Sequence, residues 1–283
     1  MKKYILYTAA IMAITVSSCR KIETDGEIQV VVVNGGGGGG GSTTGQTITL
    51  QGRINADTVL RKANSYILKG IVYMVGNHTM TIEAGTVIKG SFSGSDVAAL
   101  VITRGSKIIA PGTATDPIIF TSLSPNPQSG DWGGIVLCGK AGYNLSYNGT
   151  AGLYQVEGGI DNANGDGLAG SGDAVAPTPV ANDNSGVLQY VRIEYAGYAF
   201  QPDKEINSLT MAAVGSGTII DHIQVTYAKD DAFEWFGGSV NCSYLIAYKT
   251  QDDDFDTDNG YNGKVQFGLV LRDSLIADIS TSE

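Results

Sequence analysis

The sequence predicts an all-β solenoid whose coils hold about 20–22 residues each, and three observations indicate this fold class. First, residues 218–258 match themselves at an offset of 22, which places Phe233 on Phe255 and Asp231 on Asp253. Second, each copy is a short strand-like run of alternating apolar residues followed by an acidic turn, with no helical period. Third, the chain holds 39 Gly but only seven Pro, as expected for a protein of many turns. Equivalent residues are therefore expected to stack in ladders along the axis, about 4.8 Å apart.

The first 18 residues are predicted to be a lipoprotein signal peptide. Lys2 and Lys3 precede an apolar run over residues 4–16 that is too short to span a bilayer. Residues 16–19 (VSSC) resemble the lipobox of bacterial lipoproteins, which implies cleavage after residue 18 and lipidation of Cys19. The protein is therefore expected to be exported and anchored in the outer membrane of a Gram-negative bacterium, facing the cell surface. The alternative is an ordinary signal peptide in which Cys19 occurs by chance.

Residues 19–46 are predicted to form a flexible tether that begins at the lipidated cysteine. The segment contains seven consecutive glycines at positions 35–41, and such a run cannot hold a packed structure. The apolar run from Val30 to Val33 interrupts it. This run is either a docking strand or has no structural role.

Residues 47–283 are predicted to form the solenoid domain. Strand-like runs cover residues 65–75 and 80–88, and a second match at an offset of 20 places Thr81 on Val101. Residues 141–186 interrupt the repeat as a long loop excursion. Another strand-like apolar run covers residues 265–271. Because a solenoid needs a cap over its last coil, the domain is expected to be C-terminally incomplete.

Two stretches carry a resemblance to a known family. Residues 112–122 read GTATDPIIFTS, and residues 132–135 read WGGI; residues 183–198 and 253–266 also match the pattern. The chain resembles bacterial surface lipoproteins of the pectin-lyase-like superfamily, which are mostly uncharacterised. The resemblance implies a right-handed parallel β-helix with about 20–22 residues per coil over roughly residues 47–278. It implies little about function, because fold does not fix function.

The catalytic signatures of this superfamily are incomplete in the sequence. Polygalacturonase-like members use an Asp-Asp pair, a Gly-His-Gly and an Arg-x-Lys. Asp230 and Asp231 match the pair, but neither His78 nor His222 lies in Gly-His-Gly, and no Arg-x-Lys occurs. Catalysis by that mechanism is therefore in doubt.

Charge limits the partners. The formal net charge is −10, and without residues 1–18 it is 16 minus 28, or −12. Such a protein repels nucleic-acid phosphates, so we expect no nucleic-acid partner. The charge is compatible with cations or neutral glycans.

The stacked acidic turns are the best candidate site. Carboxylates about 5 Å apart repel by about 3 kcal/mol at an effective dielectric constant near 20. Such a cluster must bind a cation, raise some pKa values or point into water. Many oxygen ligands suit Ca²⁺, so Ca²⁺ is the expected cofactor. The candidate ligands are Asp230, Asp231, Glu234, Asp252, Asp254, Asp256 and Asp258.

Two alternatives remain open for these acids. The first is a solvated acidic edge without a ligand. The second is a catalytic carboxyl pair, as in glycosidases, whose carboxyl spacing sets the stereochemical outcome. The candidate catalytic residues are Asp230, Asp231 and Asp253, with Asp252 and Asp254 beside them.

Aromatic residues near loops are candidate sugar-binding groups. Trp132, Trp235 and Tyr261 are expected to present exposed rings that stack on a ligand; otherwise they only cover coil corners. The remaining cysteines, Cys138 and Cys242, are expected to be two buried thiols.

The sequence thus favours a lipid-anchored surface protein that binds or adheres to glycans or other surface ligands without catalysis. One alternative is a Ca²⁺-dependent polysaccharide lyase or glycoside hydrolase that uses the acidic turns. Another is a structural stalk.

Overall fold

The computed structural model describes residues 29–33, 45–160, 163–201 and 204–277. The expected signal peptide and Cys19 lie outside the described residues. Within the described ranges, no helix is long and apolar enough to cross a membrane. The one short helix among the described residues is a 3₁₀ turn, η1 (Gly94–Asp96).

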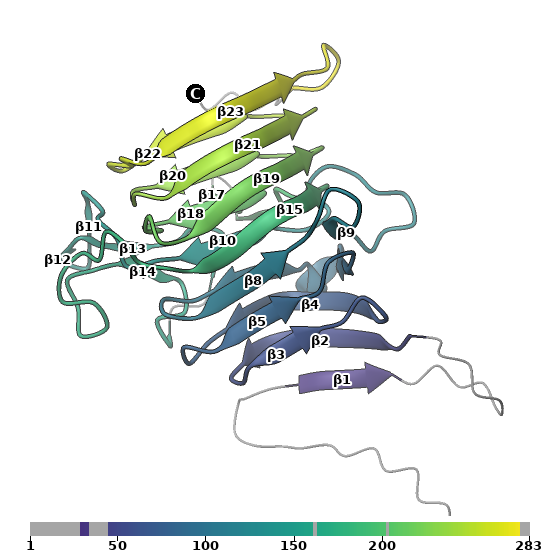
Figure 1. The fold of residues 1–283 in the computed structure, drawn as a ribbon, viewed down its shortest axis with the longest axis horizontal. Helices are drawn as coiled ribbons and strands as arrows, with labels where there is room; N and C mark the ends of the chain where they lie inside the picture. Colours follow the sequence, from purple (N-terminus) through teal and green to yellow (C-terminus); the bar gives the residue numbers. More distant parts are fainter. Residues whose placement is uncertain (1–28, 34–44, 161–162, 202–203, 278–283) are drawn as a thin grey trace, which may run out of the picture.

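The domain is a right-handed parallel β-helix, as the sequence predicts (Figure 1). Short strands wind round a common axis and stack coil upon coil from the N-terminal to the C-terminal side. Every pair between the strands that form the coils is parallel. These strands are β2 (Thr47–Ile54), β3 (Thr58–Leu60), β4 (Ser65–Met74), β5 (Thr79–Ile82), β6 (Val87–Gly90), β7 (Ala99–Ile102), β8 (Lys107–Pro111), β9 (Ile118–Ser122), β10 (Ile135–Cys138), β15 (Gly186–Glu194), β18 (Leu209–Ala212), β19 (Ile219–Thr226), β20 (Phe233–Phe236), β21 (Asn241–Tyr248), β22 (Phe255–Asp258) and β23 (Lys264–Leu271).

The offset of 22 residues is the true register from β19 to β21 and from β20 to β22. Phe233 on β20 pairs with Phe255 on β22, and Ile223 on β19 pairs with Leu245 on β21. The two phenylalanine rings stack with centroids 5.4 Å apart. A single inward column continues below them from coil to coil as far as β4. It contains Val72, Leu100, Ile135, Leu209, Phe233 and Phe255.

The coil length varies more than the sequence predicts. The match at an offset of 20 is not a register, because Thr81 pairs with Ile109 and Met74 pairs with Ile102, both 28 residues on. The matched segments are equivalent strand-and-turn units on different faces of the coil. Equivalent residues are 22 apart between β3 and β5 but 74 apart between β10 and β18. Loops absorb the difference, since only the strands must stay in register.

The excursion at residues 141–186 accounts for the longest coil, and it is not a structureless loop. It carries two small hairpins, β11 (Ser146–Tyr147) with β12 (Thr150–Ala151) and β13 (Leu153–Gln155) with β14 (Leu168–Gly170). They lie at one side of the helix (Figure 1). A third hairpin follows, β16 (Ala199–Gln201) with β17 (Lys204–Glu205).

These added segments build a second core outside the coil. Their side chains cover the outward face of β7, β10 and β18, so these three strands are buried on both faces. The second core contains Tyr73, Val75, Ala99, Val101, Val136, Cys138, Val156, Ile160, Ala169, Ile206, Ala212 and Ala213. Cys138 and Cys242 are both buried and free, as predicted.

The two ends of the β-helix differ. At the N-terminal end, β1 (Gln29–Val33) pairs antiparallel with β2, so the apolar run in the tether is a strand that covers this edge. At the C-terminal end, all eight residues of β23 are exposed, including Phe267 at 57%. That the domain is C-terminally incomplete stays a prediction.

Candidate functional site

The acidic turns stack one above the other, as the repeat predicts. Asp230 and Asp231 lie between β19 and β20, and Asp252 and Asp253 lie one coil further on, between β21 and β22. The backbone N–H of Asp253 donates to Asp231 Oδ1 at 2.9 Å. The backbone of one turn therefore fixes the carboxylate of the turn below it.

Two groups of carboxylates form around Asp231. Asp230, Asp231 and Asp252 form one group, and Asp231, Glu234 and Asp256 form the other. In each group, one ligand oxygen from each residue lies within 4.8 Å of the others. Glu234 and Asp256 meet because they are paired neighbours on β20 and β22. The structure thus brings together five of the seven acids that the sequence selects.

The centre of this cluster is buried rather than exposed to water, so Asp231 and Glu234 do not form the solvated acidic edge that the sequence left open. Asp231 is 7% exposed and Glu234 is 4% exposed. The coil below and the excursion explain this burial. Asn207, in the loop before β18, donates through Nδ2 to Glu234 Oε2 at 3.2 Å. Tyr154 of the excursion packs on Phe236, two residues beyond Glu234, with ring centroids 5.0 Å apart.

Burial and mutual repulsion perturb the ionisation of these acids. Burial, followed by the neighbouring Asp231, raises the pKa of Asp230 to about 8. The pKa of Glu234 is raised by burial and by its contact with Asp231. Burial is also the main cause that raises the pKa values of Asp231 and Asp256. Without a cation, part of the cluster therefore holds protons where ordinary carboxyls are ionised.

The structure places the remaining candidate acids elsewhere. Asp254 accepts hydrogen bonds from Thr250 Oγ1 and from Arg272 Nε, the latter at 2.8 Å, so a guanidinium neutralises it. Asp258 is exposed and accepts from Asn259 Nδ2 at 3.1 Å. The side chain of Asp253 is exposed and belongs to neither carboxylate group among the described residues. Asp253 therefore contributes through its backbone.

The expectation that the two tryptophan rings are exposed is wrong, because both indoles are 0% exposed. Trp235 points inward because it lies two residues after the inward Phe233 on the same strand. The alternation of side chains along that strand would have predicted this direction from the sequence. Trp132 closes a coil corner, where its Nε1 donates to the carbonyl oxygen of Glu194 at 2.8 Å. Tyr261 is half-buried, and its hydroxyl donates to the carbonyl oxygen of Val240 at 2.8 Å. Neither indole can stack on a ligand.

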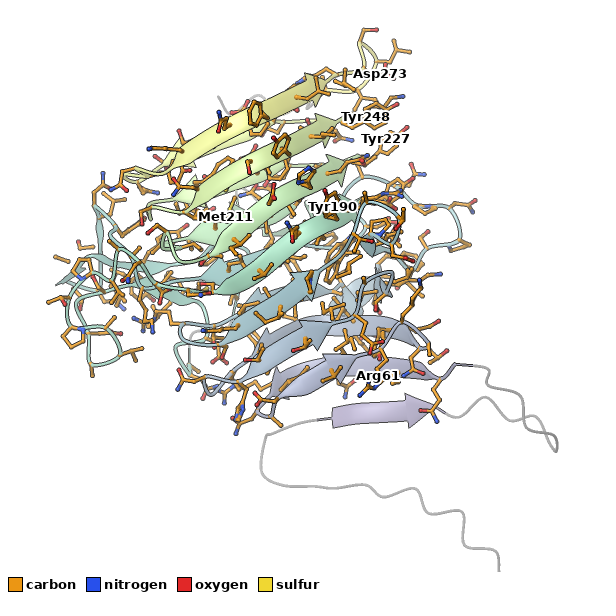
Figure 2. The ribbon with its side chains drawn as sticks, viewed as in Figure 1. Arg61, Tyr190, Met211, Tyr227, Tyr248 and Asp273 are labelled. Carbon is orange, nitrogen blue, oxygen red and sulfur yellow. The ribbon has the colours of Figure 1, made fainter. Side chains whose placement is uncertain are left out.

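A column of aromatic rings, which the sequence does not predict, lies on the outer surface instead. Tyr190, His222, Tyr244 and Phe267 stack on the outer face of β15, β19, β21 and β23, and Figure 2 labels Tyr190 at the base of this column. Successive ring centroids are 4.3, 4.4 and 4.7 Å apart. All four residues have positive φ, between 48° and 62°. This conformation breaks the strand alternation and turns the rings outward, and no residue type in the sequence signals it.

The ring column forms one wall of a groove of about 540 Å³. The other wall is the column two residues further along each strand, from Arg192 through Gln224 and Ile246 to Leu269. Residues 113–117 contribute to the lining through Thr113, Ala114 and Pro117. The groove therefore crosses four neighbouring strands.

A polar network borders the rings. Asp221 Oδ1 lies 2.8 Å from His222 Nδ1, and Asp221 also accepts from Gln189 Nε2 at 3.2 Å and from Ser243 Oγ at 3.1 Å. Because the carboxylate only accepts, His222 Nδ1 carries the proton in this contact. The imidazole is thus fixed between Tyr190 and Tyr244, with Nε2 as its second polar atom.

The stacked parallel coils are those of a β-helix protein of the pectin-lyase-like superfamily. The chain matches the family described as "Pectate-lyase like beta helix domain" over residues 52–275, and it belongs to that family. No curated protein and no solved structure matches the chain.

Proposed function

We propose that this protein binds a linear glycan in the groove beside the ring column, on a lipid-anchored β-helix at the cell surface. The observation that carries the proposal is the exposed groove along Tyr190, His222, Tyr244 and Phe267. Four strands at about 4.8 Å spacing give it a length of about 14 Å, which suits a few linked sugar units better than a single small molecule.

The chemistry of the groove supports a sugar ligand. Tyr244 is 45% exposed and Phe267 is 57% exposed, so both offer apolar ring surface for the C–H faces of a sugar. Gln189, Asp221 and Ser243 lie along the ring column and provide donors and acceptors for hydroxyl groups. Arg192 is the basic residue of the lining, in an ion pair with Glu194. A neutral chain, or one with few acidic groups, fits this surface.

The position of the carboxylates with raised pKa values supports binding rather than hydrolysis at this groove. They belong to β20, β22 and the turns before them, whereas β15, β19, β21 and β23 line the groove. Asp231 and Glu234 are also buried. A glycan in the groove would therefore not meet the carboxyl groups of this cluster.

Binding is tested by electrophoresis of the purified full chain through gels that contain neutral or acidic polysaccharides. We expect one polysaccharide class to retard the protein, and Tyr244→Ala to weaken that retardation about 5–10-fold, since one ring contact contributes about 1–1.4 kcal/mol. The control is Phe92→Ala, which removes a ring that is 38% exposed and lies outside the groove. Equal retardation of Tyr244→Ala and the wild type would refute binding at this groove, and no retardation by any polysaccharide would favour the stalk.

One observation favours a second candidate, a polysaccharide lyase. Asp221 and His222 form a carboxylate–imidazole pair within the groove, and a neutral imidazole can abstract a proton next to a uronate carboxylate. Arg192 lies in the same groove and would pair with that carboxylate. Incubation with acidic polysaccharides would then give unsaturated products, which His222→Asn would abolish. Retention without such products is expected for the binding protein.

The proposed anchor is tested separately. In cells, we expect the wild type in the membrane fraction and the Cys19→Ala variant in the soluble exported fraction, because the variant offers no thiol for lipidation. A Cys19→Ala variant that stays in the membrane fraction would refute lipid anchoring through this residue.

A further inference from the structure

We propose that Asp231, Glu234 and Asp256 bind one Ca²⁺ ion between two neighbouring coils, with Asn207 closing the site. The inference is independent of glycan binding, because none of these residues lines the groove.

The first observation is a set of buried oxygen atoms without hydrogen-bond partners. In the described part of the chain, Glu234 Oε1, Asn207 Oδ1 and Ser208 Oγ are buried and unpartnered. Glu234 is 4% exposed, Asn207 6% and Ser208 0%. Leaving one such group without a partner is unfavourable, and here three lie on adjoining segments. A cation held by the oxygens of Glu234 and Asn207, which are already in contact, would remove that cost for both groups.

The second observation is the geometry of the carboxylates. Oxygens of Asp231, Glu234 and Asp256 all lie within 4.8 Å of one another. Calcium binds oxygen at about 2.4 Å, so two oxygens on opposite sides of one ion are about 4.8 Å apart. The three carboxylates therefore stand at the separation that a shared Ca²⁺ ion requires.

The neighbouring residues can complete the coordination. Asn207 now donates through Nδ2 to Glu234 Oε2 at 3.2 Å, and half a turn of its amide would present Oδ1 to the ion instead. Asp230 and Asp252 lie in the adjoining group, which shares Asp231. All these ligands are oxygens, and that donor set suits Ca²⁺ rather than Zn²⁺, which favours nitrogen and sulfur.

The position of the ion gives it a structural role. Asp231 and Glu234 belong to one coil, Asp256 to the next coil, and Asn207 to the coil before, in the turn that leads into β18. One ion would join all three parts. Without it, the same carboxylates repel one another and favour separation of the two coils.

The test uses the full chain after removal of divalent ions with EDTA. We expect calorimetric titration to show one Ca²⁺ per chain and Ca²⁺ at about 100 times its Kd to raise the Tm by about 5–10 °C. Glu234→Gln removes one ligand charge but keeps the volume and the contact to Asn207, so the variant should fold. We expect it to lose both effects.

The matched control is Asp258→Asn on the same strand as Asp256, because Asp258 is exposed and outside both carboxylate groups. This variant should keep both effects. The proposal is overturned if the folded wild type binds no Ca²⁺ or if Glu234→Gln binds it unchanged. Equal affinity for Mg²⁺ and Ca²⁺ would overturn the assignment to calcium, since Mg²⁺ requires a tighter octahedral site.

Discussion

Raising the pH from 5 to 7 in EDTA should destabilise the domain, and the cause lies in the buried acidic cluster. Burial raises the pKa of Asp230 to about 8 and also raises the pKa values of Asp231 and Glu234. The charged groups that act on these three from the neighbouring turns and strands are themselves acids. They are Glu205, Asp252, Asp256 and Asp258.

The sign follows from the protons bound in each state. Between pH values of about 4 and 8, the unfolded chain has released these protons while the folded cluster keeps them. The folded state then binds more protons, so the stabilisation is complete below a pH of about 4 and is lost as the pH rises toward 8. One proton contributes about 1.4 kcal/mol per pH unit.

The size of the effect is limited by coupling. Because the acids act on one another, we count one net proton for the buried Asp231–Glu234 pair. Two pH units then lower the free energy of unfolding by about 3 kcal/mol, which corresponds to a fall in Tm of about 5–11 °C for a domain of this size.

The assay is thermal unfolding followed by circular dichroism at pH 5, 6 and 7, in EDTA and at constant ionic strength. Glu234→Gln should flatten the profile, because it removes the shared proton. Comparison with the variant cancels the contributions of groups outside the cluster. A wild-type Tm that is constant or rises toward pH 7, or an equally steep profile for Glu234→Gln, would contradict the reasoning.

Two further predictions concern the core. Trp132→Ala removes a fully buried indole and should lower stability by about 3–5 kcal/mol, or about 6–20 °C in Tm, without changing polysaccharide retention below the Tm. A small loss of stability together with a loss of retention would instead make Trp132 a ligand-binding residue. Gly90→Ala should lower stability by about 1–3 kcal/mol, because the new Cβ would lie 2.8 Å from Trp132 Cβ. The control Gly142→Ala meets nothing within 4 Å and should leave the Tm unchanged in the same melting experiment, so equal Tm values for both variants would show that the corner at Gly90 is loosely packed.

The sequence by itself determined the winding of the chain and its register near the C-terminal end. Parallel coils place equivalent residues directly over one another, so a repeat in the sequence becomes a ladder in space. The offset of 22 therefore yields the contact between Phe233 and Phe255 and the stacking of Asp231 beneath Asp253. The same alternation predicts the inward direction of Trp235, once Phe233 is placed in the core.

Only the tertiary structure decided which acids form the site. Glu234 is buried because Asn207 of the coil below and Tyr154 of the excursion lie against its strand, and neither belongs to the 22-residue repeat. Asp254 is withdrawn from the cluster by Arg272, 18 residues further along the chain. Neither contact follows from spacing in the sequence, since long connections between coils can dock on any exposed face.

The groove depends on the tertiary structure for a different reason. Its rings point outward because Tyr190, His222, Tyr244 and Phe267 have positive φ, a conformation that side-chain patterns do not encode. Stacking of the coils then joins four separate outward rings into one continuous wall. The sequence specifies the strands that stack in this protein. The long connections and the local backbone conformation decide which of their side chains are accessible to a ligand.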